Sequence, residues 1–364
     1  MKRIVIVYGG KSSESEISVL TSLKVYKELK KTNNQVYLVY LDQEGNFYSS
    51  KNLEKVEAYS SKDKFKKVNF NKKKSSYYFA SKFKRTYFDL VLILGHGKNI
   101  EDGTLSSYFE TLNIPYIYDD LTNVSLLMDK VKTKLVFKAL DIKVTNYQIV
   151  HSYEVADKFD LDFSYPLIIK PSRLGSSIGI IRVNKKEDLL ENLIKGFTYD
   201  ETLLIEEYIE DKVEYNIALL GYQNKILFSE IEEVNSSKEV LTFYDKYDYT
   251  SNNKKRIISP QIECELIKEI KETSKTIFNK LNLCGLYRFD FIFDKKRHIL
   301  YLNEVNSLPG SLAYYLFEKQ GISLSELVYM YIDILTLKNR NRNKLSTSFL
   351  DGFISKVDID KLKK

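Results

Sequence analysis

The segment Ile4-Val5-Ile6-Val7-Tyr8-Gly9-Gly10 decides the fold of the first part of this chain of 364 residues. Its unbroken apolar run, rich in β-branched residues, indicates a strand buried in a parallel sheet, and the glycines end that strand. Apolar residues at helical spacing follow over residues 15–29, and apolar runs at residues 36–41 and 90–94 predict two more strands. Strands that alternate with helices in this way predict an α/β fold with a doubly wound sheet.

Four parts are expected along the chain: an N-terminal α/β domain (1–117), a central domain (118–200), a C-terminal domain (201–340) and a charged tail (341–364). Residues 43–86 are rich in lysine and tyrosine and predict an insertion of weak strands and loops. A helix is expected from Leu121 through Met128 and Lys130, and a second helix over residues 262–281. Further strands are predicted at residues 165–170, 179–183, 203–205, 215–220, 226–231, 287–293 and 299–305. From about Lys338 the chain is charged, and we expect a loosely held end.

Composition excludes several classes of protein. The net charge of +7 arises from 56 basic and 49 acidic residues, with lysines gathered at residues 62–67 and 72–74. No nucleic-acid-binding motif accompanies them, so we expect a solvated lysine surface and no nucleic-acid partner. The two cysteines, Cys264 and Cys284, lack CxxC spacing and are expected to be small buried residues. The N-terminal apolar run is too short for a signal peptide, and no segment reaches the ~18 apolar residues of a membrane span. An intracellular protein without a membrane partner is expected.

The loop Gly175-Ser176-Ser177-Ile178-Gly179 allows two interpretations. It matches the GxSxG nucleophile elbow of α/β-hydrolases, with Ser177 as nucleophile and His298 as a late histidine partner. That motif requires a helix after the serine, whereas a β-branched strand follows here. The alternative is a β-loop-β turn whose serine hydroxyls and backbone amides hold phosphates, with Lys170 adding a cation. A GxxxxGK[ST] P-loop is absent from the sequence.

Two further segments bring acidic residues onto strands. In Gly285-Leu286-Tyr287-Arg288-Phe289-Asp290-Phe291, Arg288 and Asp290 share one face, and in Tyr301-Leu302-Asn303-Glu304-Val305-Asn306, Glu304 and Asn306 share one face. If the strands pair, two carboxylates and an amide oxygen converge, which suits Mg²⁺ that also holds phosphates. The alternative is a salt-bridge lattice on a half-exposed sheet. His96, between Gly95 and Gly97 after a predicted parallel strand, lies where α/β folds bind ligands.

Taken in order, the segments resemble the D-alanine–D-alanine ligases of the ATP-grasp class, from Ile4 to about Leu337, and look most similar to the ε-proteobacterial forms over residues 301–317. The segments that carry the resemblance are Gly9-Gly10-Lys11-Ser12-Ser13-Glu14-Ser15-Glu16-Ile17-Ser18, His96-Gly97, Glu101-Asp102-Gly103-Thr104, Met128-Asp129-Lys130, Lys170-Pro171, Gly175-Ser176-Ser177-Ile178-Gly179, Arg288-Phe289-Asp290, Asn303-Glu304-Val305-Asn306 and Pro309-Gly310. The resemblance implies an N-terminal doubly wound sheet that contributes to the substrate site, followed by a two-part ATP-grasp fold whose C-terminal half holds the metal.

The resemblance also implies a set of binding residues. ATP would lie between the central and C-terminal parts, with two Mg²⁺ ions, for which Mn²⁺ can substitute. The matching residues are Lys130, Lys170 and Lys246 for phosphates, Ser176 and Ser177 in the loop over them, Glu206, Glu207 and Ile209 for adenine, Glu214 for ribose, and Asp290, Glu304 and Asn306 for the metal.

For the chemistry, the resemblance implies that the carboxylate of one D-alanine attacks the γ-phosphate of ATP. The amine of a second D-alanine then attacks the acyl phosphate. The matching residues are Glu14, Ser176, Tyr247 and His96 for the first D-alanine, Arg288 and the Gly310 amide for the oxyanion, and Tyr315 with the Leu316 amide for the second carboxylate. Tyr247, rather than phenylalanine, implies a dipeptide product, and the loop over residues 244–253 is expected to close over the site.

The sequence departs from the family pattern at Tyr118, Tyr244 and Tyr315, which puts the shape of the second substrate site in question. We therefore predict a cytoplasmic enzyme that makes D-alanyl-D-alanine for peptidoglycan precursors and cell shape, in a family that is commonly homodimeric. Two alternatives remain: a ligase that makes D-alanyl-D-lactate or D-alanyl-D-serine, and a non-catalytic ATP-grasp nucleotide sensor. Intact Lys130, Lys170 and Arg288 count against the sensor.

Overall fold

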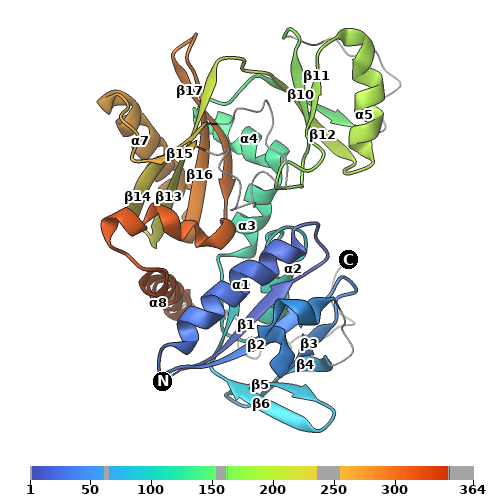
Figure 1. The fold of residues 1–364 in the computed structure, drawn as a ribbon, viewed down its shortest axis with the longest axis vertical. Helices are drawn as coiled ribbons and strands as arrows, with labels where there is room; N and C mark the ends of the chain where they lie inside the picture. The colour runs from blue at the N-terminus through green and yellow to red at the C-terminus, as the bar shows by residue number, and fades with distance from the viewer. Residues whose placement is uncertain are drawn as a thin grey trace, which may run out of the picture.

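Three sheets organise the protein, as seen in a computed structural model that describes residues 2–60, 65–152, 161, 163–235, 255–342 and 344. The N-terminal sheet lies at the bottom of Figure 1, and the central and C-terminal sheets lie above it. Helix α3 (Leu121–Met128) lies between the lower and upper parts, and α4 (Lys130–Ala139) lies between the two upper sheets. None of the described helices is long and apolar enough to cross a membrane.

The parallel half of the N-terminal sheet is wound in both directions from β1. Its order is β2–β1–β7–β8, formed by β2 (Gln35–Leu41), β1 (Arg3–Gly9), β7 (Leu90–Ile93) and β8 (Tyr116–Ile117). Helix α1 (Ser15–Lys30) links β1 to β2, and α2 (Thr104–Thr111) links β7 to β8 on the other side. The order therefore reverses between β1 and β7, which is where open α/β sheets bind ligands at the carboxyl ends of their strands. The predicted doubly wound sheet is confirmed.

The lysine- and tyrosine-rich segment extends this sheet with antiparallel strands, as the sequence predicted. Beyond β2 the order continues through β3, β4 and β5 to β6 at the edge. Aromatic rings fill its inner side, where Phe70 makes edge-to-face contacts with Phe47, Phe88 and Phe109. The elements are β3 (Phe47–Ser49), η1 (Lys51–Glu54), η2 (Val56–Tyr59), β4 (Lys66–Lys73), β5 (Ser76–Ser81) and β6 (Lys84–Phe88).

The central part is a small antiparallel sheet covered by one helix. Its order is β11–β10–β12–β9, and α5 (Leu189–Phe197) packs on β10, β11 and β12. Buried aliphatic side chains from the helix and the sheet form its own core. The strands are β9 (Tyr147–His151), β10 (Leu167–Pro171), β11 (Ile181–Val183) and β12 (Thr202–Glu207), with a short η5 (Lys186–Asp188) before α5.

The C-terminal sheet runs β15–β14–β13–β16–β17. Helix α7 (Cys264–Lys280) contacts β13, β16 and β17, while α8 (Leu324–Arg342) contacts β13, β16 and α1 and so joins this part to the N-terminal domain. The strands are β13 (Lys212–Tyr222), β14 (Lys225–Asn235), β15 (Lys255–Ile258), β16 (Cys284–Asp294) and β17 (Ile299–Asn306). The turns η6 (Gly310–Leu316) and η7 (Glu318–Gln320) lead into α8.

Four details differ from the sequence predictions. The expected single helix from Leu121 to Lys130 breaks at Asp129, whose carboxylate accepts the Lys132 amide and caps α4. Strand β11 is shorter than expected and begins at Ile181 because Gly179 takes a positive φ of 73°. Helix α8 continues beyond Lys338, which is buried against Asp119. Cys264 is exposed at the start of α7, whereas Cys284 is buried as predicted.

Candidate active site

A cavity of about 240 Å³ is lined by residues from all three parts of the chain. Most of the residues singled out in the sequence line it: Glu14, His96, Lys130, Lys170, Ser176, Ser177, Glu206, Glu207, Ile209, Glu214, Arg288, Asp290, Glu304, Asn306, Gly310 and Tyr315. Leu316 is fully buried and does not line it. Lys246, Tyr247 and the predicted mobile loop lie outside the described residues. The sequence therefore identified the walls of one cavity without showing how the parts meet.

The first wall is formed where the N-terminal sheet reverses direction. Glu14 follows the glycines that end β1, and His96 follows the end of β7. The Glu14 side chain is buried and accepts a short hydrogen bond from the Ser176 hydroxyl, which comes from the central part. A side chain at Gly97 would place Cβ 2.0 Å from the Ser12 hydroxyl, so only glycine fits this close approach. The N-terminal domain thus presents a carboxylate to the central domain.

His96 is held neutral in this wall. The ring is 3% exposed, and its Nε2 lies 3.3 Å from the Thr21 hydroxyl, while its backbone amide donates to Ser18 at 2.8 Å. Burial, aided by the nearby Arg288 guanidinium, lowers the pKa of His96 to about 4. A contact with the Leu308 carbonyl opposes this lowering. At neutral pH the imidazole can accept or donate a hydrogen bond but carries no charge.

Glu101 is a second carboxyl group beside Glu14. Burial is the largest cause, and the charge of Glu14 the second, that raise the pKa of Glu101 to about 8. The Gly97 amide, which donates to Glu101 at 2.6 Å, opposes this rise. Two carboxyl groups that share one region favour a proton on one of them, and the charge of Lys130 only partly opposes this. The wall near Glu14 therefore carries one negative charge rather than two at neutral pH.

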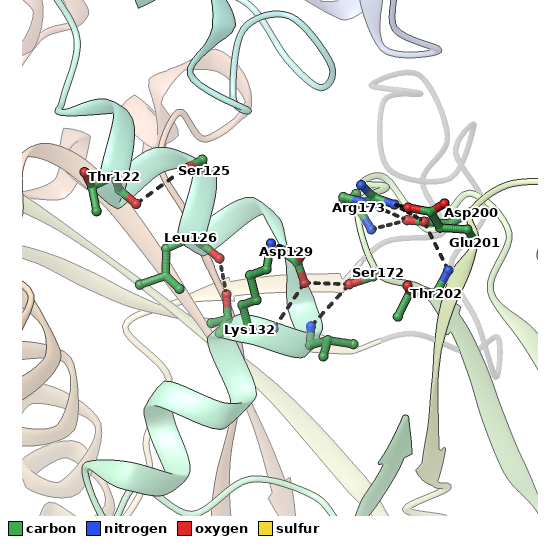
Figure 2. A network of polar contacts seen from close by, with 12 residues as sticks. Thr122, Ser125, Leu126, Asp129, Lys132, Ser172, Arg173, Asp200, Glu201 and Thr202 are labelled. Carbon is green, nitrogen blue, oxygen red and sulfur yellow. Dashed lines mark hydrogen bonds and ion pairs between the residues drawn. The ribbon is translucent and has the colours of Figure 1, made fainter. Parts of the chain in front are cut away.

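The second wall is the start of α4 and the loop after β10, tied together by Asp129 (Figure 2). Asp129 accepts from the Ser172 hydroxyl at 2.7 Å and from the Lys132 amide at 3.1 Å, and the Lys130 amide donates to the Ser172 carbonyl at 2.8 Å. Arg173, which comes next, pairs with Asp200 at 2.7 Å. This network fixes Lys130 over the glycine-serine loop, where its Nζ donates to the Leu174 carbonyl.

The glycine-serine loop joins two antiparallel strands, β10 and β11, and no helix follows it. Ser176 and Ser177 both take left-handed backbone conformations, with φ of 52° and 61°. A side chain at Gly175 would come within 2.9 Å of the Glu14 carboxylate, so the loop lies against Glu14. The hydrolase interpretation is therefore wrong, because a nucleophile elbow needs a strand before the serine and a helix after it.

A buried chain of charges links α4 to the central sheet. Glu206 is 2% exposed and pairs with Lys134 at 2.5 Å and with Lys170, and the Thr145 hydroxyl donates to it at 3.1 Å. Burial alone would raise its pKa, but the two lysines lower the pKa of Glu206 to about 2. Glu206 raises the pKa of Lys170 against the effect of burial. Lys170, which also donates to Asn303 at 3.1 Å, therefore remains a cation in the cavity.

The strand end after Glu206 forms one side of the cavity mouth. Glu207 accepts from the Asn146 side chain and from Arg297, both at 3.2 Å. Ile209 is buried, and Glu214 on β13 pairs with Lys212 at 2.7 Å. An apolar contact with backbone groups beside it and a carboxylate a few residues away can hold a flat heterocycle and a diol.

The third wall is the paired strands β16 and β17, as predicted. In the register Asp290 faces Glu304 and Arg288 faces Asn306. Both Asp290 oxygens accept from Arg288 at 2.7 Å, and the Asn306 amide donates to Asp290 at 3.1 Å. No group of three or more His, Cys, Asp and Glu gathers as a metal cage among the described residues. Two facing carboxylates in a cavity with lysines suit a cation that shares its ligands with phosphate.

The turn after Gly310 holds an unusual backbone. Ser311, Leu312 and Ala313 have φ of 52°, 56° and 44°, a left-handed conformation that costs an L-residue ~1–2 kcal/mol. The Leu312 amide donates to the Pro309 carbonyl at 2.8 Å, and the side chains of Leu312 and Ala313 are buried. Packing of this turn therefore determines where Gly310 and Tyr315 face the cavity, which sequence periodicity could not reveal.

Sequence reasoning missed several residues of the cavity and its support. Glu101, Thr145, Asn216 and Arg256 line it, and Lys134 and Glu232 hold residues that do. Lys134 is one turn after Lys130 on α4 and so shares its face, but the predicted helix reached only to Lys130. Asn216, Glu232 and Arg256 could not have been found, because their partners are on strands whose order only the tertiary structure defines.

Comparisons with known proteins agree with this architecture. Family models described as the D-ala D-ala ligase N-terminus and C-terminus match residues 3–118 and 136–333. Relatives named D-alanine--D-alanine ligase include those of Thermosipho melanesiensis, 31% identical over 99% of this chain and 100% of the relative, and Thermosipho africanus, 33% identical over 92% and 93%.

Among solved structures, the VanG D-Ala:D-Ser ligase from Enterococcus faecalis has a TM-score of 0.77 at 25% identity, covering 92% of this chain and 99% of that one. The D-alanine-D-alanine ligase from Helicobacter pylori has a TM-score of 0.73 at 28% identity, covering 91% and 98%. The predicted ATP-grasp architecture is thereby confirmed. Since the two models span most of the sequence and curated relatives match it nearly end to end, the chain belongs to the D-alanine–D-alanine ligase family.

Proposed function

We propose that this chain joins two D-alanine molecules to D-alanyl-D-alanine and releases ADP and phosphate. The observation that carries the proposal is the cavity in which Lys130, Lys170 and the serine loop face Arg288 and the paired strands β16 and β17. Those cations suit a polyphosphate, and the carboxylates opposite suit the metal that would accompany it. Membership of the ligase family agrees with this assignment.

ATP binds between the central and C-terminal sheets in this proposal. Glu206, Glu207 and Ile209 lie along the adenine, Glu214 meets the ribose, and Lys130, Lys170 and Ser177 meet the phosphates, with Lys246 as a further phosphate ligand. The support is the strand end at Glu207 and the buried lysines held as cations by Glu206. Lys170 acts by drawing negative charge to a fixed point in a pocket from which water is largely excluded.

Asp290, Glu304 and Asn306 hold two Mg²⁺ ions in this proposal, with Mn²⁺ as a substitute. When bound, the metal neutralises phosphate charge as the γ-phosphoryl group moves. The support is the cross-strand pairing of the carboxylates at the cavity wall and the bonds from Arg288 and Asn306 that orient Asp290. Arg288 and the Gly310 amide stabilise the oxyanion that forms when the second amine attacks the acyl phosphate.

The first D-alanine is held by its ammonium group at Glu14, with Ser176, Tyr247 and His96 around it. Its carboxylate oxygen forms a bond to the γ-phosphorus as ADP leaves. The amine of the second D-alanine then forms the peptide bond as phosphate leaves, and that amine loses a proton. The second carboxylate lies near Tyr315 and the Leu316 amide. The support for the first site is the Ser176–Glu14 hydrogen bond across the domain boundary.

We further propose the division into residues 1–117, 118–200, 201–340 and 341–364, and a cytoplasmic enzyme that supplies peptidoglycan precursors, with a homodimer as its assembly. The similarity of residues 301–317 to ε-proteobacterial forms belongs to the proposal as well. It agrees with the 28% identity to the Helicobacter pylori enzyme, although the Thermosipho relatives are more similar in sequence.

A D-serine ligase is the alternative that one observation favours, because VanG is among the similar structures. The curated relatives at 31–33% identity are all named for D-alanine. The test incubates the purified protein with ATP, Mg²⁺ and D-alanine, D-serine, D-lactate or L-alanine, and measures phosphate and product. We expect dipeptide from D-alanine and little from L-alanine. Equal rates with both enantiomers of alanine, or phosphate release without dipeptide, would overturn the assignment.

A further inference from the structure

A row of polar side chains continues from the metal-site strands across the C-terminal sheet. Glu304 faces Asp290, Asp290 faces Asn216, and Asn216 faces Glu232 in the register of β17, β16, β13 and β14. Side chains directly opposite on neighbouring strands share a face of the sheet. Glu232 is therefore on the same face as the metal-site carboxylates, two strands away from Asp290.

Glu232 is the point where three elements meet. The carboxylate is 1% exposed, and its Oε2 accepts from the Asn216 amide at 3.0 Å and from the Tyr315 hydroxyl at 3.1 Å. Its Oε1 lies 3.5 Å from the Nε of Arg256 on β15 and has no hydrogen-bond partner among the described residues. A buried carboxylate needs a nearby cation, and Arg256 supplies it.

The contact with Glu232 changes what Tyr315 can do in the cavity. A tyrosine hydroxyl has one proton, and in this structure it is donated to Glu232. Burial and the charge of Glu232 raise the pKa of Tyr315, so the hydroxyl keeps that proton at neutral pH. Towards the cavity it presents only lone pairs, which repel a carboxylate. Another donor is needed if the second substrate is bound by its carboxylate.

Arg256 is placed to be that donor. It lines the cavity, its side chain is 33% exposed, and its guanidinium lies 5.4 Å from the centre of the Tyr315 ring. Its Nε lies 3.5 Å from Glu232, and a guanidinium has further N–H groups in a planar fork that matches a carboxylate. The neighbouring Arg288 makes two bonds to Asp290, and its remaining N–H groups are assigned to the oxyanion in the proposed function.

We propose that Arg256, held in place by Glu232 and Tyr315, is the residue that recognises the carboxylate of the second substrate. The proposal rests on the proposed ligase function, because it assigns a role within the second amino-acid site. Glu232 and Tyr315 act as positioning residues: Glu232 fixes the guanidinium by its charge, and the Tyr315 ring supports it from the side. The class of second substrate is thereby restricted to α-carboxylates, whatever nucleophile they carry.

The test compares D-alanine with D-alaninamide as the second substrate. D-Alaninamide lacks the carboxylate that must be phosphorylated, so it can enter only the second site, and its product is distinguished by mass. The wild type should prefer D-alanine. Arg256→Ala should lower the use of D-alanine by about 10- to 100-fold, the range of one charge-assisted hydrogen bond, while the use of D-alaninamide stays within about threefold. Arg256→Lys should restore part of the preference.

Two further variants separate the roles. Tyr315→Phe should change the preference by less than about threefold, because the lost hydroxyl pointed at Glu232, whereas Glu232→Gln should reduce it by about 3- to 10-fold. Arg85→Ala, an exposed arginine on β6, is the matched control and should behave as wild type. If Arg256→Ala lowers both activities equally, or if Tyr315→Phe alone removes the preference, the proposal is wrong. Absence of any dipeptide from the wild type would instead contradict the ligase function.

Discussion

Two acids of this protein are each held by a cation, but one is closed in by protein groups and the other faces a cavity. Asp119, just after β8, is 2% exposed and is closed in by donors from three other elements: the Cys284 amide at 3.0 Å, the Asn123 amide at 3.1 Å, the Tyr287 hydroxyl and the Lys338 ammonium group. Asp290 is half-buried and also paired, yet its cluster forms the wall of the cavity. Burial and pairing of charge therefore do not mark a functional site, and an adjoining space for a ligand does.

The difference follows from where the two clusters lie. The Asp119 cluster joins the linker after the N-terminal domain to β16 and α8, so its charges serve the attachment of one domain to another. The Asp290 cluster is at the free face of the same strand β16, two residues from Arg288. One strand thus carries a structural cluster near its start and a candidate catalytic cluster in its middle.

The largest expected effect is a loss of turnover when the Asp290 cluster is changed. Glu304→Gln and Asp290→Asn should lower dipeptide synthesis on the order of 10³-fold, because each removes a charge that neutralises phosphate, worth several kcal/mol in the transition state. The melting temperature of each variant should stay within about 2 °C of the wild-type value. Steady-state kinetics and calorimetry check both. Glu272→Gln on the exposed face of α7 is the control, and full activity in either site variant would show that this wall holds no metal.

A change in the Asp119 cluster should lower stability and leave turnover nearly unchanged. Asp119→Ala leaves Lys338 buried beside only Asp120 and should cost about 3–5 kcal/mol of unfolding free energy. Turnover per folded molecule should change less than about threefold. Denaturant unfolding measures the first quantity and active-site titration the second. Asp333 is on the same helix as Lys338 and makes an exposed ion pair with Lys2. Asp333→Ala should cost under about 0.5 kcal/mol of unfolding free energy. A stable but inactive Asp119→Ala protein would erase the distinction between the clusters.

Glu101 sharpens the comparison because its pKa is raised although the Lys130 cation acts on it. Its pKa of about 8 exceeds its ordinary 4.5, so between those values the folded protein binds more protons than the unfolded chain. The stability that the protonated group contributes is complete below about pH 4.5 and is lost as the pH rises through 8. Relative to Glu101→Gln, the wild type should lose on the order of 3 kcal/mol between pH 5 and 9. Unfolding curves with the same pH dependence in both proteins would show that Glu101 is ionised throughout.

The smallest effect on stability and on ATP binding is expected at Thr145, which lies between the buried Lys134 and Glu206 of the cavity. Thr145→Val removes the hydroxyl that bridges Lys134 and Glu206, at 3.0 and 3.1 Å, and should cost about 1 kcal/mol with a few-fold rise in KM for ATP. Thr145→Ser keeps the hydroxyl and should restore both values. Urea unfolding and ATP titration decide the matter: a rise in KM for ATP without loss of stability would mean that Thr145 contacts the nucleotide directly.

Local sequence predicted the elements well because each carries its own period. The run from Ile4 to Tyr8 became β1, and the alternation around Asp290 and Glu304 gave the correct shared faces. The break at Asp129 was missed although its capping contact with the Lys132 amide is local, and the Ser172 hydroxyl that also holds Asp129 follows a strand distant in sequence. Glu232 and Arg256 were missed for the same reason, since their partners belong to strands that only the tertiary fold brings together.

The central claim is that the Asp290 cluster is one wall of a ligase site that forms an acyl phosphate, and isotope transfer tests this claim most directly. D-Alanine labelled with ¹⁸O in both carboxylate oxygens is incubated with the full chain, ATP and Mg²⁺, and the phosphate and dipeptide are analysed by mass spectrometry. Attack of the carboxylate on the γ-phosphorus carries one labelled oxygen into each phosphate released and leaves one in the new peptide carbonyl. We expect one ¹⁸O in phosphate for each dipeptide formed, with labelled phosphate appearing on the order of 10³-fold more slowly in Glu304→Gln. Dipeptide accompanied by unlabelled phosphate would contradict the account.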